Sequence, residues 1–118
     1  MNLSAEKEIT NQLDQDEVIT FSCDISKQNR FGFWQKRHLL LTTTRLINLH
    51  GNKVKRGIQL PKISALTKST EPGNFNFIVH IEDEYDYGCI CKEREELVQM
   101  IQKCYHDLMG RDLLIYGV

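Results

Sequence analysis

The stretch FNFIVHIEDEYDYGCICKEREELVQMIQKCYHDLM, residues 75–109, changes its hydrophobic period part-way along, and this change decides the fold. Apolar side chains alternate with polar ones over 75–81 and again over 85–91, which predicts two strands that each bury one face. Over 97–108 the apolar positions recur every three or four residues, which predicts one amphipathic helix of about four turns. Gly110 is expected to end that helix.

Upstream, apolar alternation and turn residues predict five more short strands, at 18–25, 37–43, 45–50, 53–60 and 63–68. A loop is expected over 26–34. Residues 5–13 are expected to form a short N-terminal helix with Ser4 as its cap. Successive short strands joined by tight turns favour antiparallel pairing. The expected fold class is therefore mainly β: a seven-stranded antiparallel sandwich or partly open barrel, capped by one C-terminal amphipathic helix.

The length of 118 residues indicates a single domain. We expect an N-terminal helical extension over 1–17 and the domain proper over 18–110. Residues 111–118 are expected to be a tail, or the start of a following segment of a larger protein.

Charge is divided unevenly along the chain. The sequence holds 15 Lys and Arg against 16 Asp and Glu, yet residues 26–70 contain ten of the basic residues and no acidic one. If the acidic flanks fold behind this block, the domain presents one positive face. Such a face attracts a polyanion: a membrane surface, a phosphorylated headgroup or a nucleic acid.

Several classes of protein are disfavoured. No stretch approaches the roughly 20 apolar residues of a membrane span, and the N-terminus lacks a signal-peptide pattern, so a cytoplasmic protein is expected. We find no phosphate-cradling glycine motif, nucleophile elbow or zincin motif, so no enzyme is expected. The spacing Cys89-x-Cys91 is not that of a zinc knuckle or redox pair. The four cysteines are expected to be buried free thiols, and neither a metal nor a cofactor is predicted.

Local strings add a resemblance. KQNRFGFWQKRHLLLT (27–42) resembles the first loop and second strand of pleckstrin homology (PH) domains, and KRGIQL (55–60) looks like their fourth strand. YDYG (85–88) with REELV (94–98) is similar to the PH-like tail domains of class I myosins. The spacing within RHLLLTT (37–43) resembles the PH domain of phosphoinositide-dependent protein kinases. The resemblance implies the PH-like fold for the domain.

The resemblance, together with strand geometry, implies a headgroup site at one end of the sheet. Arg grips two phosphate oxygens and Lys supplies a point charge, so convergent cations suit a phosphorylated ring. The expected headgroup contacts are Lys27, Arg37 and Arg56, with Arg30 and Lys36 as helpers. The expected membrane contacts are Phe31, Phe33 and Trp34. The chain has Asn48 where lipid-binding members often place a Tyr, which favours general binding of anionic lipids over headgroup selectivity.

The leading hypothesis is a module that binds phosphoinositides or other anionic phospholipids and targets a signalling protein to the cytosolic face of membranes as a peripheral component. The alternative is a PH-fold module that binds a protein without specific lipid binding, for which an exposed strand edge at 63–68 could pair with an extended segment. Nucleic-acid binding is not expected, because the aromatic residues cluster in one loop instead of lining a sheet.

Overall fold

The structure is a computed structural model that describes residues 13, 16–28, 31–51 and 53–118. Its elements, in chain order, are β1 (Ile19–Gln28), β2 (Trp34–Thr42), β3 (Arg45–His50), β4 (Lys53–Gln59), the 3-10 helix η1 (Leu60–Lys62), β5 (Ile63–Lys68), β6 (Asn76–Ile81), β7 (Tyr87–Ile90), α2 (Arg94–Met109) and β8 (Leu114–Gly117). The expected N-terminal helix lies outside the described residues, apart from Leu13.

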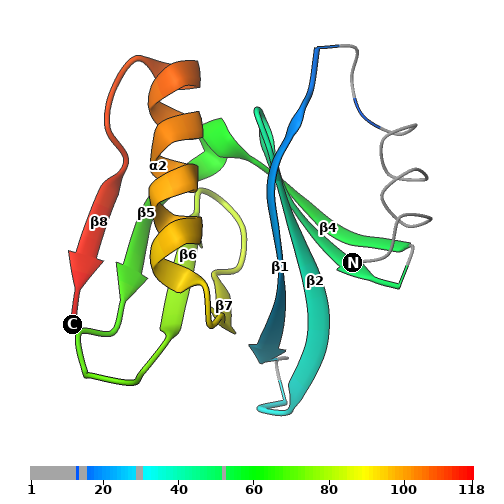
Figure 1. The fold of residues 1–118 in the computed structure, drawn as a ribbon, viewed down its shortest axis with the longest axis vertical. Coiled ribbons are helices and arrows are strands. Elements are labelled where there is room, and N and C mark those ends of the chain that lie inside the picture. Colours follow the sequence, from blue (N-terminus) through cyan, green and yellow to red (C-terminus); the bar gives the residue numbers. More distant parts are fainter. Residues whose placement is uncertain (1–12, 14–15, 29–30, 52) are drawn as a thin grey trace.

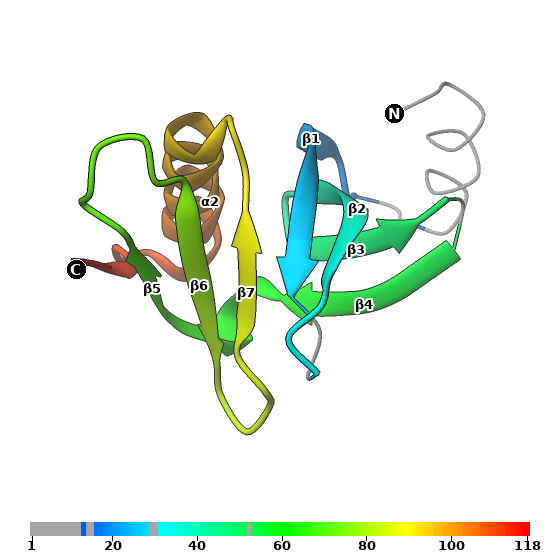
Figure 2. The same ribbon diagram turned by 90° about the horizontal axis from the view of Figure 1, so that it is seen from below.

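The described strands form one strongly bent sheet in the order β4-β3-β2-β1-β7-β6-β5-β8. Figure 1 shows α2 standing beside β5 and β8, and Figure 2 shows the sheet folding back on itself with β1 and β7 at the bend. Neighbouring strands are antiparallel except β5 and β8, which are parallel. The predicted mainly β, PH-like fold with a C-terminal helix is confirmed.

The long helix follows the prediction closely. It spans sixteen residues and ends at Met109, and Gly110 caps it in the left-handed conformation with φ 72°. Its buried stripe includes Leu97, Ile101 and Tyr105, and it packs against the core side chains of the bent sheet. This side of the sheet, which faces α2, is called the inner face below.

The structure contains an eighth strand that the sequence did not predict. Residues 114–117 pair with β5, and the amide of Thr70 donates to the Val118 carbonyl at 2.8 Å. A Cβ on Gly117 would lie 2.7 Å from the Thr70 side chain, so glycine allows this close approach. Because β6 and β8 flank β5 on its two sides, the exposed edge that we expected at 63–68 is not available for an extended partner.

Strand ends also differ from expectation. The loop expected over 26–34 is shorter, because β1 continues to Gln28 and β2 begins at Trp34. At the same end of the sheet β7 begins only at Tyr87, so Tyr85 lies in the preceding loop and is almost fully exposed. Longer β1 and β2 strands carry the basic residues of this region on a regular ladder.

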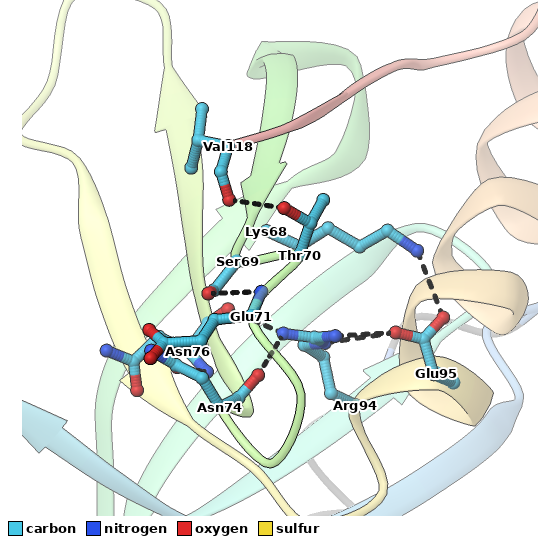
Figure 3. Close-up of polar contacts among 9 residues, drawn as sticks. All are labelled: Lys68, Ser69, Thr70, Glu71, Asn74, Asn76, Arg94, Glu95 and Val118. Atoms are coloured by element: carbon cyan, nitrogen blue, oxygen red, sulfur yellow. Dashed lines mark hydrogen bonds and ion pairs between the residues drawn. The ribbon is translucent and has the colours of Figure 1, made fainter.

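Arg94 fastens the first turn of α2 to the loop between β5 and β6 (Figure 3). Its guanidinium donates to the carbonyls of Asn74 at 2.7 Å and Asn76 at 3.1 Å, and pairs with Glu95 at 2.8 Å. Lys68 reaches the same carboxylate at 3.0 Å. These charge-assisted bonds give the Asn74 carbonyl a donor and add to the bond that the Asn76 carbonyl accepts from the Ser69 amide at 3.2 Å.

Candidate functional site

Strand parity places three basic side chains on the inner face. Side chains two apart on a strand share a face. Lys27 lies two residues after the core residue Ile25 on β1. Arg37 lies two residues before the core residue Leu39 on β2, and Arg56 lies two residues before Ile58 on β4. In the ladders Arg37 lies opposite Ile25, which is buried in the core. We call Lys27, Arg37 and Arg56 the cation rim.

Tyr87, the first residue of β7, brings the rim together. The Lys27 Nζ lies 5.4 Å from the centroid of its ring, and the Arg56 Cζ lies 5.9 Å from the same centroid. Both distances fall within the range of cation–π attraction. The ring is fully buried, so it forms an apolar floor beneath two of the three cations.

The three cations also interact electrostatically. Burial, together with the charges of Arg56 and Arg37, lowers the pKa of Lys27 from its usual range. A lowered lysine pKa means that the surroundings destabilise the charged form, since like charges repel and burial removes water. An anion in this space would relieve that repulsion.

Carboxylates neutralise the rim only weakly. Among the described residues, the carboxylate of Glu84 approaches Arg56 at 3.9 Å, and none lies within ion-pair distance of Lys27 or Arg37. Arg37 instead donates to the carbonyl of Lys36 at 2.8 Å and to the Gln35 side chain at 3.1 Å. Arg56 donates to the Tyr85 carbonyl at 2.6 Å. The guanidinium groups are held in place by neutral acceptors and keep their positive charge available.

Two polar atoms at the base of the rim are buried without a hydrogen-bond partner in the structure: the Tyr87 hydroxyl and the Asn48 Oδ1. Asn48 lies opposite Arg56 in the β3–β4 ladder. Buried polar groups are nearly always hydrogen-bonded, so this orphaned pair beneath the cations is an exception among the buried groups of the domain. Tyr87 was missed as a site residue, because a Tyr on the buried face of a strand is typical of the core, and Asn48 was considered only as a departure from the Tyr that lipid-binding members often place there.

Lys36 does not join the rim. It is adjacent to Arg37 on β2 and therefore points to the opposite, outer face, where it lies across from Ser26. There it helps to line a hollow of about 680 Å³ that also contains His38, Lys92 and Glu93. The predicted helper role for Lys36 at the rim therefore does not fit its position. Arg30, the other predicted helper, lies outside the described residues.

The three predicted membrane contacts form an exposed aromatic tip. Phe31 and Phe33 precede β2 and are 71% and 69% exposed, and Trp34, at the start of β2, is 50% exposed. Trp34 lies opposite Gln28 in the ladder, one position beyond the pair of Lys27 with Gln35. The aromatic tip thus continues the two strands that carry Lys27 and Arg37. Figure 2 shows this turn and the β6–β7 turn projecting toward the same edge of the view.

The fold and these positions match a known family. The model of the unconventional myosin tail, described as actin- and lipid-binding, matches residues 2–115. The chain belongs to this myosin tail family. The predicted resemblance to myosin tail domains is thereby confirmed, and the family description supports a PH-like lipid-binding module of no stated headgroup preference. No curated protein matches the chain by sequence.

Solved structures show the same fold for this tail domain. The hSac2 domain of the human phosphoinositide phosphatase Sac2 superposes with a TM-score of 0.70 at 15% identity, over 96% of this chain and 84% of that one. A pleckstrin homology domain solved in solution gives 0.64 at 20% identity, over 79% and 90%. The carboxyl-terminal PH domain of pleckstrin gives 0.63 at 23% identity, over 75% and 97%. Within the described residues, no helix is both long and apolar enough to cross a bilayer.

Proposed function

We propose that the cation rim binds the phosphates of a phosphoinositide headgroup and so recruits this tail domain, as a peripheral component, to the cytosolic face of a membrane. The observation that carries the proposal is the gathering of Lys27, Arg37 and Arg56 around Tyr87. Among the described residues, one carboxylate pairs with them, that of Glu84 at 3.9 Å from Arg56. The two orphaned polar atoms lie buried beneath them, so a headgroup that draws the Lys27 and Arg56 side chains away from the Tyr87 ring could reach them.

Two contributions act together in this proposal. Each Lys or Arg near an anionic leaflet contributes about 1 kcal/mol, so the rim contributes roughly 3 kcal/mol, or about 150-fold in partition. The exposed aromatic tip would then lie at the headgroup level, where amphipathic rings are favoured. Charge would direct the domain to the leaflet, and the rim would hold one headgroup.

The protein-binding alternative receives less support. Its predicted docking edge at β5 is covered by β8, as the sheet order shows. The family is described as actin-binding as well as lipid-binding, but no contact among the described residues favours a protein partner over a headgroup at the rim.

Sedimentation with vesicles of phosphatidylcholine containing a small fraction of phosphatidylinositol bisphosphate tests the proposal. Arg37→Ala and Arg56→Ala should each weaken binding by roughly tenfold or more, because each removes charge-assisted hydrogen bonds worth about 1.5–3 kcal/mol. Lys55→Ala is the matched control, since Lys55 is exposed, adjacent to Arg56 and has no partner in the β3–β4 ladder, where it forms a bulge. It should cost about fivefold at most.

Circular dichroism should show that all three variants remain folded. Equal losses in Arg56→Ala and Lys55→Ala would contradict a formed site and leave only diffuse charge. Unchanged binding in both Arg37→Ala and Arg56→Ala would place the lipid site elsewhere on the domain.

A further inference from the structure

Three metal-ligand atoms converge where β1, the end of β7 and the start of α2 meet. They belong to Cys23, Cys91 and Glu93, and all lie within 4.8 Å of one another. The two sulfur atoms are 3.3 Å apart, and the Cys91 Sγ is 3.5 Å from the Glu93 Oε2. Cys23 and Cys91 are buried free thiols, whereas Glu93 is exposed.

These separations suit a shared cation. Zinc binds thiolate at about 2.3 Å and carboxylate at about 2.0–2.2 Å in a tetrahedral arrangement, which places two ligating sulfur atoms about 3.7 Å apart. The thiols of Cys23 and Cys91 lie within a few tenths of an ångström of that separation. A disulfide would require the sulfur atoms to close to about 2.05 Å and would leave the neighbouring carboxylate without a role.

We propose that Cys23, Cys91 and Glu93 form a site for one thiophilic divalent cation of the Zn²⁺ type, with water as the fourth ligand. The cation replaces the two thiol protons, so that two thiols and Zn²⁺ give a zinc dithiolate and release two protons to solvent. Glu93 also lines the outer-face hollow together with Lys36 and Lys92. Glu93 is therefore the ligand that solvent reaches directly, and the neighbouring Lys92 places a positive charge beside the three anionic ligands.

The position of the site indicates what the ion would do. β1 and β7 share only two register pairs, Ser26–Ile90 and Lys27–Cys89, whereas β1 and β2 share nine. A cation held by Cys23 and Cys91 would join the two halves of the bent sheet at this short seam. Cys23 also lies four residues before Lys27 on the same face, so the ion would brace the strand that supplies one rim cation. The site stands independently of the proposed lipid binding.

The test uses the reduced protein after metal is removed with EDTA, with Co²⁺ as the spectroscopic probe. Saturation at one Co²⁺ per chain with a thiolate-to-cobalt charge-transfer band, displaced by Zn²⁺, is the expected result. Zn²⁺ should also raise the melting temperature, because a ligand that binds only the folded state stabilises it. Absence of the charge-transfer band in the reduced protein would overturn the proposal.

Three variants locate the ligands. Cys23→Ser should abolish the band, and Cys104→Ser, which removes a buried thiol on α2, should leave it unchanged. Removal of a residue that hydrogen-bonds to a metal ligand lowers metal affinity by about 10–100-fold. Glu93→Gln removes a ligand itself, so it should weaken Co²⁺ binding by at least roughly tenfold. Because Glu93 is exposed, this variant tests the site even if Cys23→Ser fails to fold. Unchanged Co²⁺ affinity in Glu93→Gln would overturn the assignment. It would also be overturned if the native protein took up no metal and hydrogen peroxide converted Cys23 and Cys91 to a disulfide.

Discussion

Replacement of Tyr87 by phenylalanine should stabilise the domain and weaken its lipid binding at the same time. The hydroxyl of Tyr87 is buried without a hydrogen-bond partner in the structure. Burial of an unpaired hydroxyl costs about 1–3 kcal/mol, whereas the phenyl ring keeps the apolar floor beneath Lys27 and Arg56. Tyr87→Phe should therefore raise the free energy of unfolding by about 1 kcal/mol or more.

The same hydroxyl lies beneath the cation rim, and we expect a headgroup that draws Lys27 and Arg56 away from the ring to bind it. Its loss removes one hydrogen bond, worth about 1 kcal/mol, so vesicle binding should fall roughly fivefold. Urea unfolding followed by circular dichroism measures the first effect, with an unchanged slope, and the melting temperature should rise by about 4 °C per kcal/mol. Sedimentation with vesicles that contain phosphatidylinositol bisphosphate measures the second.

Tyr105→Phe is the matched control. The Tyr105 hydroxyl is on a buried side chain but accepts a hydrogen bond from Arg111 at 3.2 Å. Its removal should destabilise the domain slightly and leave lipid binding unchanged. A Tyr87→Phe variant that is less stable than the native protein would show that its hydroxyl has a partner in the folded state. A more stable variant with undiminished lipid binding would remove Tyr87 from the proposed site.

Four further predictions concern the fold and the rim. Arg94→Ala should cost about 1–3 kcal/mol of unfolding free energy, because it leaves the carbonyl of Asn74 without its donor; an unchanged free energy of unfolding in urea would contradict this. The Asn76 carbonyl and the Glu95 carboxylate keep Ser69 and Lys68 as partners. Arg45→Ala should cost about 3–5 kcal/mol, since it removes the positive charge that pairs with the buried carboxylate of Glu17 at 2.8 Å, and a neutral effect in the same assay would refute it. Ile101→Ala should cost about 2–5 kcal/mol of unfolding free energy by opening a cavity under α2. A loss near zero in thermal melting would show that the apolar stripe of α2 is not in the core. Lipid binding should weaken as the pH rises, at a lower pH than that at which ordinary lysines lose their proton, because the pKa of Lys27 is lowered and only its protonated form attracts phosphate. Lys27→Arg should abolish this pH dependence. An identical pH profile in the native protein and the variant would contradict the prediction.

Much of the architecture could be predicted because local pattern and tertiary packing agree. The helix stripe and Gly110 fix α2, and strict alternation fixes β6. β8 could not be predicted, since its four residues carry no period of their own and its partner β5 lies about fifty residues earlier in the chain. Pairing over such a separation depends on the assembled sheet and on the close approach at Gly117.

The candidate site shows the same limit. Lys27, Arg37 and Arg56 could be chosen because the order of the strands brings the first two to one end of the sheet and the family resemblance adds Arg56. Lys36 could have been excluded, because it is adjacent to Arg37 and adjacent residues on a strand point to opposite faces. The prediction included Lys36 because of its charge. The Cys23–Cys91 pair was missed because the sequence analysis considered only the short spacing between Cys89 and Cys91. The sulfur that approaches Cys91 belongs to Cys23 on β1, 68 residues away.

The measurement that tests the central claim most directly is equilibrium binding to two sets of vesicles with equal total negative charge. One set carries phosphatidylserine and the other phosphatidylinositol bisphosphate, and each is measured at low and at high salt. A formed cation rim predicts a preference for the bisphosphate of about tenfold or more that survives at high salt, because direct contacts are screened less than a diffuse field. Equal binding to the two sets, with a steep loss on addition of salt, would contradict the claim.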